Sequence, residues 1–143
     1  IDNNVPAICS VNGNAGAAAL SSKNVVGSGP LLMQNGNVQA VNNTSDHNTT
    51  SHPRTAIGVT KDGRVLFVTV DGRFPGLAVG MSSELLAKYM KILGAYSALN
   101  LDGGGSTTMW IKDKGVVNHT SQGGTGSWDN PKERSVGSII YVK

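Results

Sequence analysis

The stretch RVLFVTVDGRFPGLAVGMSSELLAKYMKILGAYSALNLD, residues 64–102, decides the fold of this chain. Its two ends, residues 64–70 and 96–101, are rich in apolar and β-branched side chains and predict strands. The segment between them predicts a helix over residues 82–93. A strand, a helix and a strand in this order favour two parallel strands joined by a right-handed crossover.

The predicted helix has a start signal and a stop signal. Ser82 can cap its N-terminus, Glu84 suits the positive end of the helix dipole, and Gly94 can end the helix. The helical repeat then predicts one buried stripe, made of Leu85, Leu86, Tyr89, Ile92 and Leu93.

Two hairpins are also expected. Asn35-Gly36 separates candidate strands at residues 30–34 and 37–41, and both residues of an Asn-Gly pair tolerate the positive φ of a tight turn. The second hairpin joins residues 54–60 to residues 64–70. If Asp62-Gly63 is its two-residue turn, counting outward along both strands places Arg54 opposite Asp71.

The remaining elements complete an α+β fold: a mixed β-sheet with hairpins and one main helix crossover, expected to be part of a larger domain. Residues 107–111 and 136–142 predict further strands, and residues 121–134 predict a long loop. Residues 1–26 predict an irregular N-terminal segment, and residues 27–143 predict the domain that carries all of these elements.

Composition limits the classes of function. The chain has 143 residues and a formal net charge of +3, and no run of Lys or Arg marks a nucleic-acid or membrane surface. The small-residue run at residues 14–20 is too short to span a bilayer. Cys9 is the only cysteine in the chain, so no internal disulfide can form. A small, negatively charged substrate is compatible with the net positive charge of the chain.

Two carboxylates are expected to meet at one edge of the sheet. Asp71 directly follows the first strand of the crossover, and Asp102 directly follows the second. Because parallel strands end on the same side of a sheet, both side chains should lie where such sheets bind ligands. The hairpin register adds Arg54. These three residues are the catalytic candidates, because an arginine suits a phosphate and a carboxylate can act as a nucleophile or activate water.

A glycine-rich run follows Asp102. Its glycines can turn without steric cost and present N–H groups to an anion, although a purely structural turn fits the run equally well. The run is not a P-loop, because it lacks the required lysine spacing and leads into a strand. The expected substrate- or phosphate-binding residues are Gly103, Gly104, Gly105, Ser106 and Thr107 of this run, together with Arg73, Arg134 and Trp128.

Plainer interpretations stay open for these residues. Arg54 and Asp71 could form an ordinary cross-strand ion pair. Arg73 and Arg134 could be solvated surface charges. Trp110 alternates within a predicted strand and is expected in the core. Trp128 lies in a polar loop and can stack on a sugar ring.

The three histidines, His47, His52 and His119, all fall in polar segments. Because no HxxxH or HExxH spacing links them, each is expected at the surface rather than in catalysis or metal binding. Asn118-His119-Thr120 matches a glycosylation sequon, for which chance is the simplest explanation. Asn100 and the two catalytic aspartates offer oxygen donors to a divalent cation, but no ligand spacing requires one. No cofactor is implied.

Ordered motifs lie within residues 27–142. They are Gly29-Pro30-Leu31-Leu32, Pro53-Arg54-Thr55-Ala56-Ile57-Gly58, Val70-Asp71-Gly72-Arg73, Gly80-Met81-Ser82, Gly94-Ala95-Tyr96-Ser97-Ala98-Leu99-Asn100-Leu101-Asp102-Gly103-Gly104-Gly105-Ser106-Thr107 and Glu133-Arg134-Ser135-Val136. In this order they resemble the phosphodiester glycosidase family, which includes the uncovering enzyme, N-acetylglucosamine-1-phosphodiester α-N-acetylglucosaminidase. The family commonly has proline where this chain has Ser135. Family domains also carry a substantial segment ahead of the first motif, so the resemblance implies the C-terminal portion of such a domain.

The resemblance implies a hydrolase that cleaves the glycosyl–phosphate bond of sugar-1-phosphodiesters, with a sugar of the N-acetylhexosamine class. It also implies a secreted, periplasmic or cell-envelope location. The expected partners are a small-molecule or glycan phosphodiester as substrate, and either a complementary N-terminal segment or a second copy of the chain. No nucleic acid and no membrane span are expected.

Two other classes of function remain open. A non-catalytic glycan- or phosphoglycan-binding module of a secreted or surface protein would use the same edge of the sheet without turnover. A nucleotide-binding domain built on the glycine-rich run fits less well, because the lysine and the following helix of such a site are absent.

Overall fold

A computed structural model describes residues 6–11, 24–41, 44–122 and 127–142. The predicted irregular segment at residues 1–26 lies mostly outside these ranges, and its described residues contain no helix or strand. The chain divides into two compact units. The first contains Ile1–Thr50, Ala56–Val68 and Ser82–Leu101, and the second contains Ser51–Thr55, Thr69–Met81 and Asp102–Lys143.

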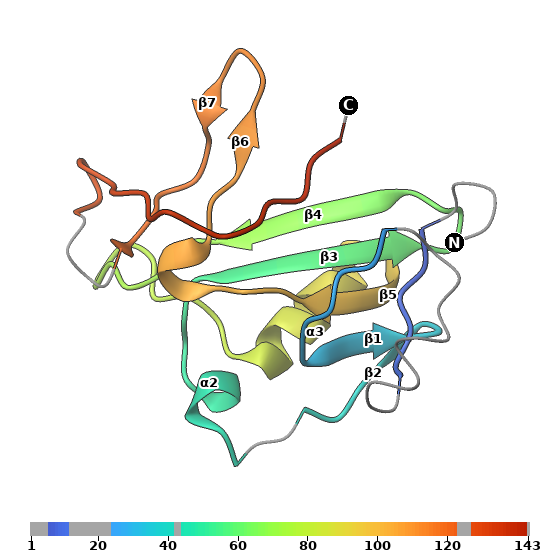
Figure 1. Cartoon of the computed structure of the whole chain (residues 1–143). Helices are drawn as coiled ribbons and strands as arrows, with labels where there is room; N and C mark the ends of the chain where they lie inside the picture. The colour runs from blue at the N-terminus through green and yellow to red at the C-terminus, as the bar shows by residue number, and fades with distance from the viewer. Residues whose placement is uncertain (1–5, 12–23, 42–43, 123–126, 143) are drawn as a thin grey trace. The chain divides into compact units, whose positions relative to one another are not determined.

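The described residues form short strands and one main helix (Figure 1). The elements are β1 (Leu31–Gln34), β2 (Asn37–Val38), α2 (Asp46–Thr49), β3 (Arg54–Thr60), β4 (Val65–Val70), α3 (Ser83–Ile92), β5 (Ala95–Asn100), the 3-10 helix η2 (Gly104–Ser106), β6 (Trp110–Ile111) and β7 (Gly115–Val116).

The sheet of the first unit has the strand order β2-β1-β5-β3-β4. β5 is antiparallel to both of its neighbours, β1 and β3. β4 lies beside β3, and Figure 1 shows their arrows pointing in opposite directions. β4 and β5, the strands on either side of α3 in the sequence, therefore run in the same direction, with β3 between them. The α+β class is confirmed, although this parallel relation joins strands that are not neighbours in the sheet.

The turn between β1 and β2 forms as predicted. Asn35 has a φ of 52° and Gly36 a φ of 80°, the positive values that a tight two-residue hairpin turn requires. Gln34 and Asn37 are paired directly across the turn.

The turn between β3 and β4 differs from the prediction. Thr60 N donates to the carbonyl oxygen of Arg64 at 2.9 Å, and Gly63 N donates to the carbonyl oxygen of Thr60 at 3.1 Å. The loop therefore has three residues, 61–63. A two-residue turn would need positive φ at both Asp62 and Gly63, and of these only Gly63 has it, at 84°.

The three-residue loop shifts the hairpin register by one residue. Counting outward from its ends places Val70 opposite Arg54, one residue away from the predicted partner, Asp71. Successive residues of a strand point to opposite faces of a sheet, so a shift of one residue changes which side chains can meet.

The ends of α3 are the predicted ones. Ser82 is the N-cap, and its hydroxyl accepts a hydrogen bond from Leu85 N at 3.3 Å. Gly94 follows the C-cap with a φ of 89°, a value that glycine adopts at no steric cost.

The buried face of α3 is not the predicted one. Of the predicted stripe only Leu86 is buried, and Ile92 is 77% exposed. The helix packs on β1 and β5, and it buries Ser83, Ala87 and Met90 together with Leu86. Both stripes have helical spacing, so the repeat alone does not choose between them. On the observed face, the Ser83 hydroxyl donates a hydrogen bond to Asn48 of α2 at 3.3 Å, a contact that the repeat of the helix does not signal.

The core of the first unit contains apolar residues of α3 and of the sheet strands. Full burial of a Leu or Met side chain stabilises a fold by about 1.5–3 kcal/mol. Gly58 of β3 contributes by being small, because a Cβ there would lie 2.7 Å from Met90 Cε. The buried apolar residues of this unit are Leu32, Met33, Ala56, Leu86, Ala87, Met90, Ala95 and Ala98.

In the second unit, β6 and β7 form a two-stranded antiparallel ribbon. The strand predicted at residues 107–111 is reduced to Trp110–Ile111, and Trp110 is exposed instead of buried in a core. Residues 136–142, also predicted as a strand, have no regular structure and are exposed. Alternating β-branched residues indicate only a capacity to pair, and no strand of the described sheets pairs with this segment.

Neither helix in the described ranges is long and apolar enough to cross a membrane.

Candidate active site

The predicted catalytic residues all belong to the second unit, where two Asp-Gly pairs pack against Pro53. A Cβ on Gly72 would lie 2.7 Å from Pro53 N, and a Cβ on Gly103 would lie 2.7 Å from the carbonyl oxygen of Pro53. Such distances are tolerated only by glycine. Asp71 and Asp102 each precede one of these glycines, so both aspartates flank the same piece of backbone.

Arg54 lies at the start of β3 and has no solvent exposure. Its Nε donates to the carbonyl oxygen of Met81 at 2.8 Å, and Met81 exchanges two backbone hydrogen bonds, of 3.0 and 3.2 Å, with His52. Burial lowers the pKa of the Arg54 guanidinium. The arginine therefore helps to tie residues 52–54 to residue 81. Phosphate binding by Arg54 stays a prediction, because a ligand would have to reach a side chain that solvent does not reach.

Asp71 is held by the segment formed by Asn118 and His119. Its Oδ1 accepts hydrogen bonds from Asn118 Nδ2 at 3.2 Å and from His119 N at 3.0 Å, and its Oδ2 lies 3.2 Å from His119 Nδ1. Asn118 also accepts a hydrogen bond from Met109 N at 2.7 Å and donates to the carbonyl oxygen of Thr107 at 3.0 Å. Asn118 thus fixes the position of the segment that contacts the carboxylate.

Aromatic rings surround this contact. The imidazole of His119 is stacked on the indole of Trp128, with ring centroids 3.6 Å apart and planes inclined by 8°. Phe74 meets the same indole edge-on, with centroids 5.6 Å apart. One face of Trp128 is therefore occupied by a ring of the chain itself. The predicted stacking of Trp128 on a sugar stays a prediction, and it would use the other face of the indole.

Asp102 opens an exposed turn that continues into η2. Its side chain is 80% exposed, and its Oδ2 lies 3.6 Å from Arg134 Nη2. Its Oδ1 accepts a hydrogen bond from Gly103 N at 2.9 Å. The same Arg134 nitrogen donates to the hydroxyl of Ser106. The carboxylate, the hydroxyl and the guanidinium therefore form one polar group at the surface of the unit.

Arg73 brings a second guanidinium to this turn. A Cβ on Gly104 would lie 3.0 Å from Arg73 Nη2, so the arginine side chain passes directly over the glycine. Arg73 itself is exposed and has a φ of 66°, an uncommon value for a residue with a side chain. Two exposed arginines, Arg73 and Arg134, thus border the turn that Asp102 opens.

The N–H groups of the glycine-rich run are mostly engaged within the protein, and Gly105 is buried. Besides Gly103, which bonds to Asp102, three of them donate to backbone carbonyls. These are Gly104 N to Pro53 at 2.9 Å, Ser106 N to Gly103 at 3.1 Å and Thr107 N to Gly104 at 3.2 Å. The hydrogen bonds favour the structural-turn interpretation of the run. Recognition of an anion here would depend on the arginine side chains instead.

The predicted residues thus fall into two groups, joined by the backbone of Asp71-Gly72-Arg73. One contains Asp71 and Trp128, and the other contains Asp102, Ser106, Arg134 and Arg73. His119, which links Asp71 to Trp128, was expected only as a surface residue. Its contact joins residues 48 apart in the chain, and neither its spacing nor its neighbours in sequence signal it. The sequence marks Asn118 only as part of a sequon.

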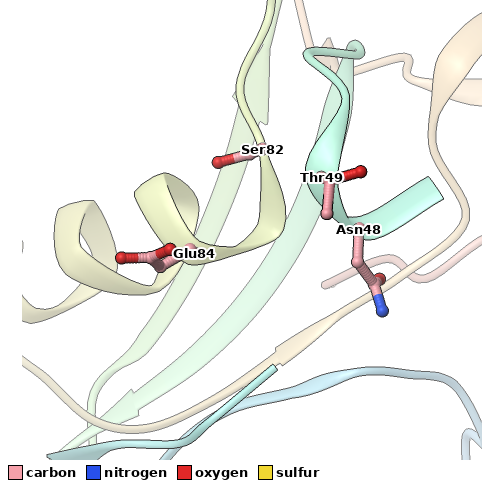
Figure 2. A pocket seen from close by; sticks show the side chains of 4 residues that line it. All are labelled: Asn48, Thr49, Ser82 and Glu84. Atoms are coloured by element: carbon pink, nitrogen blue, oxygen red, sulfur yellow. The ribbon is translucent and has the colours of Figure 1, made fainter. Parts of the chain in front are cut away.

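A hollow in the first unit is a second candidate site (Figure 2). It is lined by Asn48 and Thr49 of α2 and by Ser82 and Glu84 at the start of α3. Ser82 is already engaged as the helix cap, and Glu84 forms an ion pair of 2.7 Å with Lys88 that lowers the pKa of the carboxyl. A carboxylate at this position would repel an anion. The hollow therefore does not fit a phosphate.

Within the ranges that the structure covers, no three His, Cys, Asp or Glu side chains gather as metal ligands would.

The family model for phosphodiester glycosidases matches residues 2–143 of the chain. The chain belongs to the phosphodiester glycosidase family. No curated protein matches it. Among solved structures, the chain is similar to the catalytic domain of zebrafish N-acetylglucosamine-1-phosphodiester α-N-acetylglucosaminidase, auto-inhibited by its pro-peptide, with 26% identity and a TM-score of 0.55. That match covers 67% of this chain and 34% of the zebrafish chain.

Two further structures are similar to parts of the chain. A hypothetical protein from Synechocystis has 29% identity and a TM-score of 0.51, over 76% of this chain and 18% of its own. A Burkholderia pseudomallei protein described as exported has 49% identity and a TM-score of 0.48, over 50% of this chain and 14% of its own. The chain therefore spans between 14% and 34% of the length of these three structures.

Proposed function

We propose that this chain carries the anion-binding part of an enzyme that hydrolyses the glycosyl–phosphate bond of sugar-1-phosphodiesters, with a sugar of the N-acetylhexosamine class. Membership of the phosphodiester glycosidase family supports the reaction class, and the name of the zebrafish relative supports the sugar. The observation that carries the proposal is the placement of Arg73 and Arg134 at the turn opened by Asp102.

The chemistry of this turn suits a phosphodiester. A phosphodiester carries one negative charge shared by two free oxygens, and a guanidinium can donate to both at once. The ion pair between Arg134 and Asp102 is exposed, and such pairs are worth only about 0–1 kcal/mol. A phosphate that binds Arg134 therefore displaces the Asp102 carboxylate at little cost. The released carboxylate can stabilise the positive charge that develops at the anomeric carbon or attack that carbon.

The other catalytic candidates have supporting roles in this proposal. Asp71 lies one residue from the glycine that contacts Pro53 and is engaged by Asn118 and His119. Arg54 is buried and helps to hold the 52–54 backbone against which both Asp-Gly pairs pack. We also propose that the protein acts outside the cytoplasm, as the family resemblance implies.

Removal of Arg134 tests the anion-binding role. Arg134→Ala should raise KM about ten- to hundredfold for an N-acetylglucosamine-1-phosphodiester, because a hydrogen bond to a charged group contributes about 1.5–3 kcal/mol. It should change KM little for a neutral aryl N-acetylglucosaminide. Arg64→Ala is the matched control, since Arg64 is an exposed arginine of the β3–β4 turn, paired with Asp62. Equal losses on the charged and the neutral substrate would contradict a phosphate-binding role.

A non-catalytic phosphoglycan-binding module is the alternative. The chain spans 34% of the zebrafish structure, and a partial domain can retain an anion-binding surface without turnover. Binding of the phosphodiester with no release of sugar would favour this second function.

A further inference from the structure

We propose that His119 is the general base of this site, activating the attacking water, and that Asp71 is the residue that positions it. The inference rests on the proposed function and assigns the proton acceptor of the same reaction. It is carried by the contacts among Asp71, Asn118, His119 and Trp128 in the second unit.

The hydrogen bonds fix which nitrogen of the imidazole carries the hydrogen. His119 Nδ1 lies 3.2 Å from Asp71 Oδ2, and an ionised carboxylate can only accept hydrogen bonds. The hydrogen of the neutral ring must therefore sit on Nδ1. This leaves the lone pair on Nε2, the nitrogen that a general base would use, and the His119 side chain is 37% exposed.

The orientation of the ring is also fixed. The stack on Trp128 prevents the imidazole from tilting, since its plane lies within 8° of the indole plane. The backbone N–H of His119 donates to Asp71 Oδ1 at 3.0 Å, so the main chain and the ring of one residue both bind the same carboxylate. Asn118 adds a further hydrogen bond to Oδ1. A ring held by its side chain, its main chain and an aromatic neighbour is pre-organised for proton transfer.

The same contacts make Asp71 a poor nucleophile. Both of its oxygens accept hydrogen bonds, and its side chain is only 21% exposed. A carboxylate in this state is better suited to orienting the imidazole and stabilising the imidazolium that forms. Asp102, at 80% exposure, stays available to the sugar.

The reaction needs a base more than it needs an acid. A phosphate monoester is a weak base and leaves the anomeric carbon without being protonated first, whereas neutral water is a poor nucleophile. In the proposed step, the water oxygen forms a bond to the anomeric carbon as the carbon–oxygen bond to phosphate breaks. The electron pair of the broken bond goes to the phosphate oxygen. One water proton passes to His119 Nε2, and Asp71 balances the resulting positive charge.

The first experiment measures the tautomer directly, by nitrogen-15 NMR of the histidine ring in the 143-residue chain. We expect the hydrogen on Nδ1 of neutral His119, and we expect Asp71→Asn to weaken this preference. The exposed His47 of α2 serves as an internal reference. A neutral His119 ring with its hydrogen on Nε2 would overturn the proposal, since that nitrogen could not then accept a proton.

The second experiment measures turnover of an N-acetylglucosamine-1-phosphodiester, with the chain alone and with an upstream family segment added in trans. His119→Gln should lower kcat about 10²- to 10⁴-fold and leave KM nearly unchanged. His47→Gln should have no effect. Added imidazole should restore part of the activity of His119→Gly, which a purely structural role of the ring would not allow.

The outcomes separate this inference from the function on which it rests. If the wild-type chain cleaves the substrate and His119→Gln cleaves it equally fast, His119 is not the base, and the proposed function stands. If the wild-type chain releases no sugar, either alone or with the upstream segment added, the proposed function fails and the base role fails with it. The NMR measurement then still decides whether Asp71 orients the ring.

Discussion

Asp71 and Asp102 occupy equivalent places in the sequence, each after a strand and before a glycine, yet their side chains have different surroundings. Asp71 is mostly covered and accepts hydrogen bonds on both oxygens, whereas Asp102 is exposed and has a weak ion pair with Arg134. Carboxylates in such different environments can take different roles in one reaction. We assign orientation to Asp71 and direct action on the sugar to Asp102.

The role of Asp102 can be tested by a nearly isosteric change. Asp102→Asn keeps an oxygen that can accept the hydrogen bond from Gly103 N, so the turn should survive. Removal of the charge should lower kcat about a hundredfold or more for a sugar-1-phosphodiester, with a small effect on KM, because the charge acts mainly in the transition state. Asp129→Asn, in an exposed part of the same unit, is the control. Full activity of Asp102→Asn would remove Asp102 from the catalytic group.

At the scale of single residues, the sequence predicts which polar residues belong to the candidate site better than it predicts which residues they contact. The Asp-Gly pairs stand out because glycine after a strand marks a tight turn, and their packing on Pro53 fits that signal. His119 could not be found in this way. Its role depends on a contact across 48 residues with Asp71 and on a stack with Trp128, and neither leaves a local pattern.

At the scale of elements, α3 separates what local signals determine from what packing determines. Its cap and its end follow from Ser82 and Gly94, whose effects act within one turn of the helix. Its buried face depends on contacts with β1, β5 and α2, such as the hydrogen bond from Ser83 to Asn48, and no signal within the helix specifies these contacts.

The two candidate faces of α3 predict opposite results for two substitutions. Leu86→Ala should lower the free energy of unfolding by about 2–5 kcal/mol, because Leu86 is fully buried. Ile92→Ala should change it by no more than about 0.5 kcal/mol, because Ile92 lies at the surface. Urea denaturation followed by circular dichroism measures both. A large loss of unfolding free energy for Ile92→Ala would instead support the buried face predicted from the sequence.

In the strands, too, local signals determine some features and packing determines others. The turn at Asn35-Gly36 is predicted because both residues favour positive φ, and the structure has it. The β3–β4 loop has one residue more than predicted. The two-residue turn requires a positive φ at Asp62, and the sequence alone does not reveal whether an aspartate adopts it. Residues 136–142 have the composition of a strand but no partner among the described strands, and pairing cannot be read from one strand alone.

At the scale of the whole molecule, the first unit leaves apolar side chains uncovered. Val65 and Phe67 are exposed on β4, the last strand of the sheet order, and Leu85, Tyr89 and Ile92 are exposed on α3. Open sheet edges and apolar patches are places where proteins associate. Because the matched structures are much longer than this chain, we propose that the N-terminal part of a phosphodiester glycosidase domain covers these surfaces.

The proposal predicts that the 143-residue chain alone self-associates and turns over weakly. An upstream family segment supplied in trans should make it monodisperse and raise its turnover. Sedimentation velocity and the phosphodiester assay measure the two effects, and Phe67→Lys should reduce self-association without the segment. A monomeric and fully active isolated chain would contradict the proposal. Dimers of the chain that turn over the phosphodiester would show that a second copy covers the exposed apolar surfaces of β4 and α3.

The glycines packed against residues 52–53 also limit how this protein can change over evolutionary time. Every single-nucleotide change in a glycine codon that replaces the amino acid adds at least a Cβ or ends the chain. At Gly72, Gly80 and Gly103 that atom would collide with the backbone of Pro53 or His52. The neighbouring aspartates face no such steric barrier. A lineage that abandoned catalysis could therefore lose Asp102 by drift while purifying selection for folding preserved Gly103, so the glycines should outlast the carboxylates beside them.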